Sequence, residues 1–276
     1  MKEPTEEIRN GPRFEFGENW RKFLRWFSEE RLAQAETSLK NALEVQSLEG
    51  ISFLDIGSGS GLISLAARRL GAEVHSLDLD PQSVACTKEL KRRYFPGDPR
   101  WVTEEGNILD ILYVRHLGTF DIVYSWGVLH HTGDLWRAME YVHALVSDRG
   151  RLYIAIYNDQ GPPSARWKTV KQAYNRLPKR FRFLILWPSF LYMWFPVMLL
   201  DLLRGTPFRT WRNYSNANRG MSPWSDVVDW VGGYPFEVAK PEEIFEFYKR
   251  KGYVLNHMVT RLSGCNEFVF TKSKTR

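Results

Sequence analysis

The sequence contains only two cysteines in 276 residues, Cys86 and Cys265, and their separation matches no metal-ligand spacing. The opening residues, MKEPTEEIRNGP, lack the apolar run of a secretory signal. Internal repeats and low-complexity tracts are also missing. These absences argue against a disulfide-stabilised scaffold and a repeat architecture, and they predict a cytoplasmic protein with no metal site.

Charge is unevenly distributed along the chain. The stretch 183–200, FLILWPSFLYMWFPVMLL, carries no charged residue, and Asp201 is the single acidic residue between Arg166 and Arg219. The net charge of +6 is therefore concentrated around this stretch. With 43% hydrophobic residues the chain can bury one α/β domain plus an insertion, while its 11 tryptophans predict a pocket, a membrane interface or a partner surface.

The apolar pattern changes three times along the chain. Helical spacing from Trp20 to Leu43 predicts a helix, and after Gly50 short apolar runs alternate with amphipathic segments, which is typical of a parallel sheet covered on both faces. This alternation predicts five parallel strands and stops at Tyr157. The predicted organisation is an N-terminal helical cover over 1–49, a cofactor-binding core over 50–157, an inserted substrate lid over 158–240, and a closing helix with a terminal hairpin over 241–276.

A glycine loop follows the first predicted strand, in FLDIGSGSGLI. Its glycines would let the backbone pass close under a ligand at the N-terminus of the next helix. The pattern is G-x-G-x-G, because Leu62 stands where a dinucleotide fingerprint has its third glycine. The second strand ends at Asp78, a suitable acceptor for a ribose diol, and the third is followed by Asn107, which we expect at an adenine edge. Asp80, directly before Pro81, is the expected N-cap of the next helix.

These residues resemble the class I S-adenosylmethionine-dependent methyltransferases, especially the group of ubiquinone- and menaquinone-biosynthesis enzymes and sugar O-methyltransferases. The resemblance implies a Rossmann-like, mostly parallel α/β sheet of seven strands with an antiparallel last strand, and S-adenosyl-L-methionine as cofactor. One departure is Asn107, where the family more often has aspartate. The cofactor-binding residues that it implies are Asp55, Gly57, Ser58, Gly59, Gly61, Asp78, Leu79, Asn107, Ile108 and Ser125.

Paired histidines follow the fourth predicted strand, in YSWGVLHHTGD. The resemblance implies a general base at His130 or His131, with Asp159 after the next strand as its orienting partner. A sugar hydroxyl is a poor nucleophile until a base accepts its proton, and histidine titrates near neutrality. The alternative is that both histidines cap the following helix or pack under the lid.

The insertion after Tyr157 is expected over the carboxyl edge of the sheet, where it would select the substrate. Its apolar stretch 183–200 is near the lower limit for a membrane span, but a single crossing would separate the terminal hairpin from its sheet. We expect Pro188 and Pro196 to break the stretch into short helical pieces. These pieces would form either a buried lid or a hairpin in the membrane interface.

Aromatic side chains near carboxylates in the later insertion are typical of carbohydrate pockets, although ordinary packing is an equal alternative. The predicted substrate-binding residues are Tyr157, Asn158, Trp224, Trp230, Tyr234 and Phe236.

The sequence as a whole predicts O-methylation of a small or lipid-linked acceptor, with a sugar or quinone-like hydroxyl, by a cytoplasmic protein. Whether residues 183–200 cover the substrate, contact the inner face of the membrane or do both is left open. Two alternatives are a tRNA or nucleotide methyltransferase, for which the basic insertion argues, and a non-catalytic cofactor-binding subunit of a membrane-associated complex. A nucleic-acid partner is disfavoured because no RNA-binding module is recognisable. The acceptor, the methylated atom and the oligomeric state are not predicted.

Overall fold

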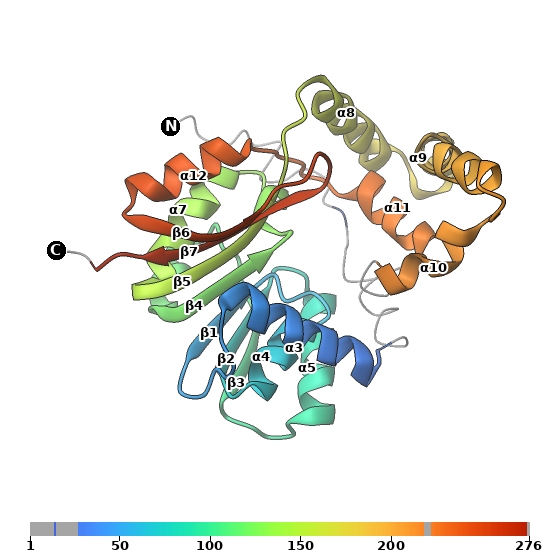
Figure 1. The fold of residues 1–276 in the computed structure, drawn as a ribbon. Helices are drawn as coiled ribbons and strands as arrows, with labels where there is room; N and C mark the ends of the chain where they lie inside the picture. The colour runs from blue at the N-terminus through green and yellow to red at the C-terminus, as the bar shows by residue number, and fades with distance from the viewer. Residues whose placement is uncertain (1–13, 15–26, 218–221, 275–276) are drawn as a thin grey trace.

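The computed structural model describes residue 14 and residues 27–217 and 222–274, and a single twisted sheet forms its centre (Figure 1). Short apolar runs rich in β-branched and aromatic residues form the strands. The strands are β1 (Ser52–Ile56), β2 (Glu73–Asp78), β3 (Trp101–Glu105), β4 (Phe120–Trp126), β5 (Val146–Tyr157), β6 (Tyr253–Val259) and β7 (Cys265–Lys272).

The strand order is β3-β2-β1-β4-β5-β7-β6. The pairs among β1 to β5 are parallel, whereas β7 is antiparallel to both β5 and β6. This confirms the predicted seven-stranded, mostly parallel sheet with an antiparallel last strand. The order reverses between β1 and β4, so the loops after these two strands meet at the carboxyl edge, where such folds bind ligands.

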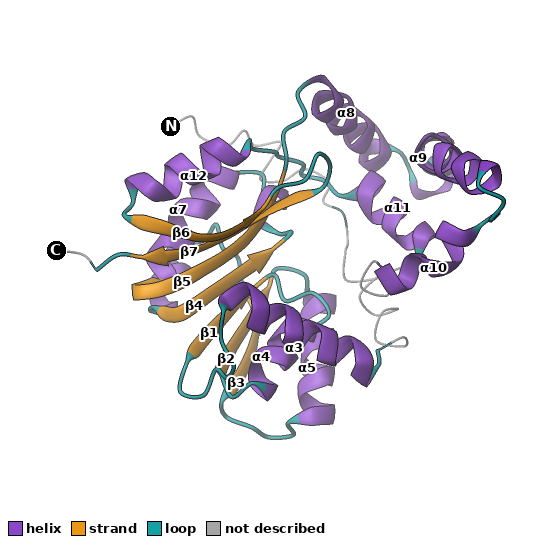
Figure 2. Cartoon of the chain, in the orientation of Figure 1, coloured by secondary structure: helices purple, strands orange, loops and turns teal. Residues whose placement is uncertain are grey.

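Two helical layers cover the sheet (Figure 2). Their apolar faces pack on opposite sides and give two separate core clusters. One layer contains α3 (Glu29–Leu43), α4 (Leu62–Arg69) and α5 (Pro81–Tyr94), and the other contains α6 (Ile111–Leu117), α7 (Leu135–Leu145) and α12 (Pro241–Arg250). A short 3-10 turn, η1 (Leu129–His131), connects β4 to α7.

The N-terminal helix is shorter than predicted. Ser28 has extended backbone angles and its hydroxyl accepts the Arg31 N–H at 3.3 Å, so α3 begins at Glu29 instead of continuing from Phe27. The hydroxyl cap explains the difference, because apolar spacing alone does not reveal where a helix is interrupted. The predicted positions around Trp20 lie outside the described residues.

The insertion between β5 and α12 forms a bundle beside the carboxyl edge (Figure 1). Its helices pack on one another around Tyr174, Phe190, Trp194 and Val231. The bundle comprises α8 (Pro162–Arg176), the 3-10 turn η2 (Lys179–Phe181), α9 (Phe183–Leu203), α10 (Arg209–Ala217) and α11 (Pro223–Gly232).

The prediction that two prolines break the apolar stretch is wrong. Pro188 and Pro196 both lie inside α9, which is one helix of 21 residues. Each proline removes only one backbone hydrogen bond, and the side that contains Phe190 and Trp194 packs on neighbouring helices, which stabilises the helix across both positions. Within the described residues, Lys179–Leu203 is the one helical segment long and apolar enough to cross a membrane.

Candidate functional site

The glycine loop after β1 adopts a conformation that requires glycine. Gly57, Gly59 and Gly61 have φ angles of 77°, 55° and 80°. A Cβ on Gly57 would lie 2.4 Å from the Val128 side chain, and one on Gly61 would lie 2.8 Å from the Thr87 backbone. The loop therefore lies directly against the segment that follows β4, so the two regions predicted to hold cofactor and catalytic groups are neighbours.

Asp78 lies at the end of β2, beside the glycine loop. Its carboxylate accepts the N–H groups of Gly59 and Asp80, both at 2.9 Å. Burial raises the pKa of Asp78, and these backbone N–H groups oppose the shift. A carboxylate has about four acceptor positions, so Asp78 can orient the loop and still accept from a ligand hydroxyl.

Asp55 is the penultimate residue of β1 and lies beneath α4. Its carboxylate is 2% exposed and accepts the Ser64 hydroxyl at 2.5 Å. The Ser76 hydroxyl in turn donates to the Ser64 hydroxyl at 2.7 Å, and the Trp101 indole N–H donates to the Ser76 hydroxyl at 2.8 Å. Burial raises the pKa of Asp55 to about 7. The buried Asp55 carboxylate therefore connects β1 to α4, the helix that follows the glycine loop, and is shielded from solvent.

The remaining predicted cofactor residues divide into two groups. Ser58 and Ser125 are buried, where Ser58 shares a 3.0 Å hydrogen bond with Thr87 and Ser125 donates to the Ile56 carbonyl. Ile108 is also buried in the core. Leu79 and Asn107 are exposed at the ends of adjacent strands, and the Asn107 side-chain carbonyl accepts the Leu109 N–H at 2.9 Å.

The two histidines after β4 have different tautomers. Tyr157 donates its backbone N–H to His130 Nδ1 at 3.2 Å, so the neutral ring carries its proton on Nε2. Burial holds the pKa of His130 well below its usual value. Its Nε2 has no hydrogen-bond partner within the described residues. His130 therefore presents a buried N–H donor and does not offer a basic lone pair.

His131 has the opposite arrangement. Its Nδ1 donates to the Pro235 carbonyl at 2.6 Å, which leaves the lone pair on Nε2. Burial lowers the pKa of His131 to about 3, and the Pro235 hydrogen bond opposes the shift. The ring is partly exposed and lies 4.5 Å from that of His130. Of the two candidates, His131 has the geometry of a proton acceptor.

Asp159 lies in the turn between β5 and α8. Its carboxylate accepts the Gly161 N–H at 2.8 Å and closes the turn that leads into α8. The tautomer of His131 is set by the Pro235 carbonyl, so a carboxylate is not required for it.

Glu237 holds the histidine loop and was not predicted as a site residue. Its carboxylate accepts the N–H groups of Gly133 and Leu135 at 3.1 and 3.0 Å, and its own N–H donates to the His130 carbonyl at 3.0 Å. Burial raises its pKa. Because Glu237 and Gly133 are 104 positions apart, no local pattern in the sequence could reveal this contact.

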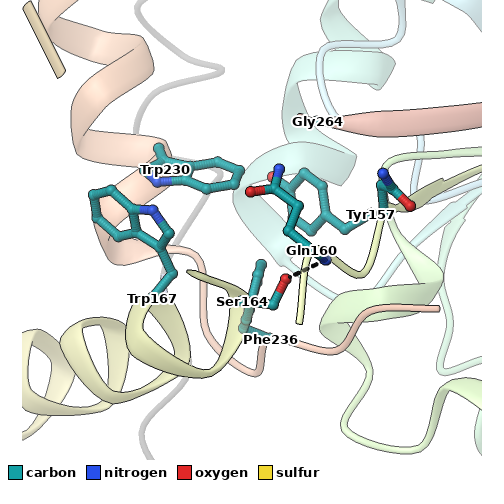
Figure 3. A pocket seen from close by; sticks show the side chains of 8 residues that line it. Tyr157, Gln160, Ser164, Trp167, Trp230, Phe236 and Gly264 are labelled. Atoms are coloured by element: carbon teal, nitrogen blue, oxygen red, sulfur yellow. Dashed lines mark hydrogen bonds between the residues drawn. The ribbon is translucent and has the colours of Figure 1, made fainter. Parts of the chain in front are cut away.

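Four predicted substrate residues surround one small cavity after β5 (Figure 3). Its volume of ≈ 10 Å³ is room for about one water molecule. The Trp230 and Tyr157 rings lie 5.3 Å apart, and the Trp230 indole N–H has no partner within the described residues. The cavity is lined by Tyr157, Asn158, Gln160, Ser164, Trp167, Trp230, Phe236 and Gly264.

Two predicted substrate residues lie elsewhere. Trp224 contacts Trp187 and Phe190 at 5.2 and 5.5 Å between ring centroids, so it packs on α9. Its long aromatic side chain completes the bundle surface, which explains its presence without a substrate. The Tyr234 hydroxyl accepts from Gln172 at 3.2 Å and lies outside the cavity lining.

Lys171 is a buried cation that the sequence did not single out. Its ammonium donates to the Trp230 carbonyl and lies 4.3 Å and 4.7 Å from the Trp230 and Phe236 ring centroids. Burial lowers its pKa to about 7, although Asp229 opposes the shift. Its charge also helps to lower the pKa values of both histidines.

Residues 54–152 match the family model described as a methyltransferase domain. This segment runs from β1 into β5 and contains the glycine loop, Asp78 and both histidines. Residues 54–152 thus form a methyltransferase domain. The predicted methyltransferase family and cofactor agree with this match. The edge residues fit S-adenosylmethionine, with an acidic acceptor at Asp78 that holds the glycine loop and the exposed apolar Leu79 beside it.

Curated relatives of this domain match parts of the chain. A ribosomal protein L11 methyltransferase of Methylococcus capsulatus is 44% identical over 25% of this chain and 24% of its own length. A ubiquinone biosynthesis O-methyltransferase of Xanthomonas campestris is 28% identical over 60% of this chain and 70% of its own length. The chain thus spans about a quarter of the first relative and most of the second.

A similar fold occurs in the crystal structure of magnesium protoporphyrin IX methyltransferase from Synechocystis PCC 6803 with bound SAH. The two structures superpose with a TM-score of 0.52 at 12% identity, over 88% of this chain and 83% of the other. At this identity the likeness establishes the fold, and the acceptor has to be argued from the site.

Proposed function

We propose that the protein transfers a methyl group from S-adenosylmethionine to a hydroxyl oxygen of a small or lipid-linked acceptor, such as a sugar or a quinone-like ring. The observation that carries this proposal is the tautomer of His131. Its Nε2 lone pair is fixed by the 2.6 Å bond to Pro235, in the segment after β4 where Val128 lies against the glycine loop. A fixed proton acceptor serves a hydroxyl nucleophile more than a nucleophile that already has a free lone pair.

When bound, S-adenosylmethionine supplies an electrophilic methyl group and its own leaving group. The chain contributes binding and proton transfer. Asp78 would accept from ribose hydroxyls while holding Gly59, and Leu79 would contact the base. His131 Nε2 would take the hydroxyl proton as the oxygen attacks, and the Pro235 carbonyl would stabilise the resulting imidazolium through Nδ1–H.

The aromatic lining of the cavity favours an acceptor that contains a flat ring. Tyr157, Trp230 and Phe236 offer ring faces, and the unpaired Trp230 N–H would be satisfied by an acceptor oxygen. Since the cavity has room for about one water molecule, a ring would enter only after the Trp167 or Trp230 side chain moves. The similarity to a ubiquinone O-methyltransferase adds support for a phenolic acceptor.

We place the protein in the cytoplasm as part of the same proposal. Cys86 and Cys265, the two cysteines of the sequence, are both buried and are not joined by a disulfide, which suits a reducing compartment.

The proposal can be tested with methyl-labelled S-adenosylmethionine and purified protein. Catechols, reduced quinone precursors, free sugars, a cell lipid extract and total cell RNA would be offered in parallel, with release of S-adenosylhomocysteine (SAH) and incorporation of label measured for each. We expect label in a base-stable ether of a phenolic, sugar or lipid acceptor. Tight SAH binding without turnover on any hydroxyl acceptor, or label recovered in the RNA fraction, would overturn the proposal.

A further inference from the structure

One side of α9 is apolar and uncovered along its whole length. The exposed side chains recur every three or four positions, as on one stripe of a helix, and none of them is charged. Monomeric soluble proteins rarely expose so continuous an apolar surface unless it meets a partner. We call it the α9 face, which consists of Phe183, Leu184, Trp187, Leu191, Tyr192, Phe195, Leu199, Leu202 and Leu203.

The opposite side of α9 is already occupied. Leu186, Phe190 and Trp194 are buried against α8, α10 and α11. Trp230 of α11 contacts Tyr157 at the end of β5, so α11 connects α9 to the sheet. Figure 1 accordingly shows α9 at the outer end of the bundle. The α9 face points away from the domain, and the prediction of a buried lid does not describe it.

The surroundings of the α9 face are cationic. Lys179 and Arg180 are exposed just before α9, and Arg204 and Arg209 are exposed just after it. The one acidic residue in the sequence from Arg166 to Arg219, Asp201, is buried and accepts the N–H and hydroxyl of Thr210 at 2.7 and 2.8 Å. An apolar stripe flanked by cations is complementary to lipid chains below a layer of anionic headgroups.

A membrane crossing by α9 is incompatible with the sheet. β5 precedes α9 and β7 follows it, yet β5 and β7 pair from Arg151 with Thr271 to Tyr157 with Cys265. A single crossing would place these strands on opposite sides of the bilayer. The 21 residues of α9 extend about 31 Å, so the helix is long enough to lie along the surface as a shallow anchor.

We propose that the α9 face inserts into the headgroup region of an anionic lipid bilayer, with α9 parallel to the membrane plane. Trp187, Tyr192 and Phe195 suit this depth, because amphipathic aromatic rings favour the boundary between water and hydrocarbon. The proposal concerns a surface outside the methyl-transfer site and does not depend on the acceptor proposed above.

Vesicle flotation tests this surface directly. Purified protein would be mixed with vesicles of phosphatidylcholine alone or with 30% phosphatidylglycerol, that is, roughly one anionic lipid in three. We expect flotation with anionic vesicles, weaker flotation with neutral ones, and a decrease of at least tenfold in partitioning for the variant L191E/F195E. Raising the salt from about 0.1 to about 1 M should also weaken binding to the anionic vesicles.

The matched control is V254E/M258E, which places two equal charges on exposed apolar positions of β6. It should float like the wild type, and both variants should retain SAH binding, which shows that the domain is folded. Absence of wild-type flotation with either vesicle, or equal losses in both variants, would overturn the proposal. A concentration-dependent dimer that L191E/F195E dissociates, without vesicle binding, would instead assign the α9 face to a second copy of the chain.

Discussion

The cofactor half of the sheet and the helical bundle satisfy their side chains in different ways. Around β1 to β3, buried polar groups form a connected set of hydrogen bonds from Asp55 through Ser64 and Ser76 to Trp101. In the bundle, α9 exposes large apolar side chains and leaves its first turn without a side-chain cap. The first region pairs polar groups with one another inside the protein, whereas the second leaves a large apolar surface in contact with water.

This difference suggests that the two regions have different functions. The predicted cofactor residues lie in the first region and are specified by short stretches of sequence, whereas the proposed acceptor and membrane contacts both involve the insertion. The histidine loop lies where the two regions meet, held by Glu237 from the segment that follows the bundle.

The largest effect on cofactor binding should come from the acidic residue at the cofactor site. Asp78→Asn loses the charge that would accept ribose hydroxyls and turns an N–H toward Gly59 or Asp80. Losing two charge-assisted hydrogen bonds of at least ~1.5 kcal/mol each should raise the Kd for SAH by about 100-fold, measured by calorimetry. Asp80→Asn removes a neighbouring charge but keeps the helix cap, and should change the Kd by less than about threefold. Similar effects of both variants would contradict a specific role for Asp78.

His131 lies in the loop where the cofactor half of the sheet and the helical bundle meet. His131→Gln should lower kcat by roughly 100- to 1,000-fold with the Kd for SAH unchanged, because it removes the proton acceptor but no cofactor contact. Asp159→Asn should change kcat by less than about threefold, since the Asp159 carboxylate closes the turn before α8. Because the pKa of His131 is about 3, kcat/KM should show no inflection near pH 6.5 from this residue. A large effect of Asp159→Asn on kcat would instead support the predicted pair, in which Asp159 orients the catalytic histidine.

The contributions of His131 and Asp55 to folding stability should depend on pH with opposite signs. His131 has a folded pKa of about 3, below its unfolded value, so the unfolded chain binds a proton first and stability is lost as pH falls below 6.5. Asp55 has a folded pKa of about 7, above its unfolded value, so its contribution is present at low pH and is lost as pH rises toward 7.

Each contribution amounts to about 2 kcal/mol between pH 7.5 and 5.0, taking 1.4 kcal/mol per pH unit. Going to pH 5.0, the unfolding free energy of His131→Gln should rise relative to that of the wild type by this amount, and that of Asp55→Asn should fall. Urea unfolding at both pH values measures the two differences. Parallel pH profiles for wild type and variants would show that neither group titrates as its burial implies.

The cofactor half was largely predictable because its signals are local. A glycine loop, a strand-ending acid and an N-cap at Asp80 are each determined by a few neighbouring residues, and the capping bond from Gln82 is present at 2.8 Å. Strand alternation gave the five parallel strands for the same reason.

The remaining features depend on contacts between distant residues. The different tautomers of His130 and His131 follow from Tyr157 and Pro235, which no local pattern connects to the LHH sequence. Likewise α9 continues through Pro188 because its other side packs on α8 and α11, and propensity alone favoured a break. Asp159 was assigned to a histidine, although its nearest donor was the Gly161 N–H two positions away.

The smallest predicted effect tests whether local caps stabilise the cofactor half. The Asp110 carboxylate accepts the N–H groups of Leu112 and Tyr113 at 2.9 and 3.3 Å at the start of α6. Asp110→Ala should lower the unfolding free energy by about 1 kcal/mol, whereas Asp110→Asn, which retains an acceptor, should lower it by less than about 0.5 kcal/mol. Equal losses in the two variants would indicate that charge near the helix N-terminus, and not the cap, stabilises this end of α6.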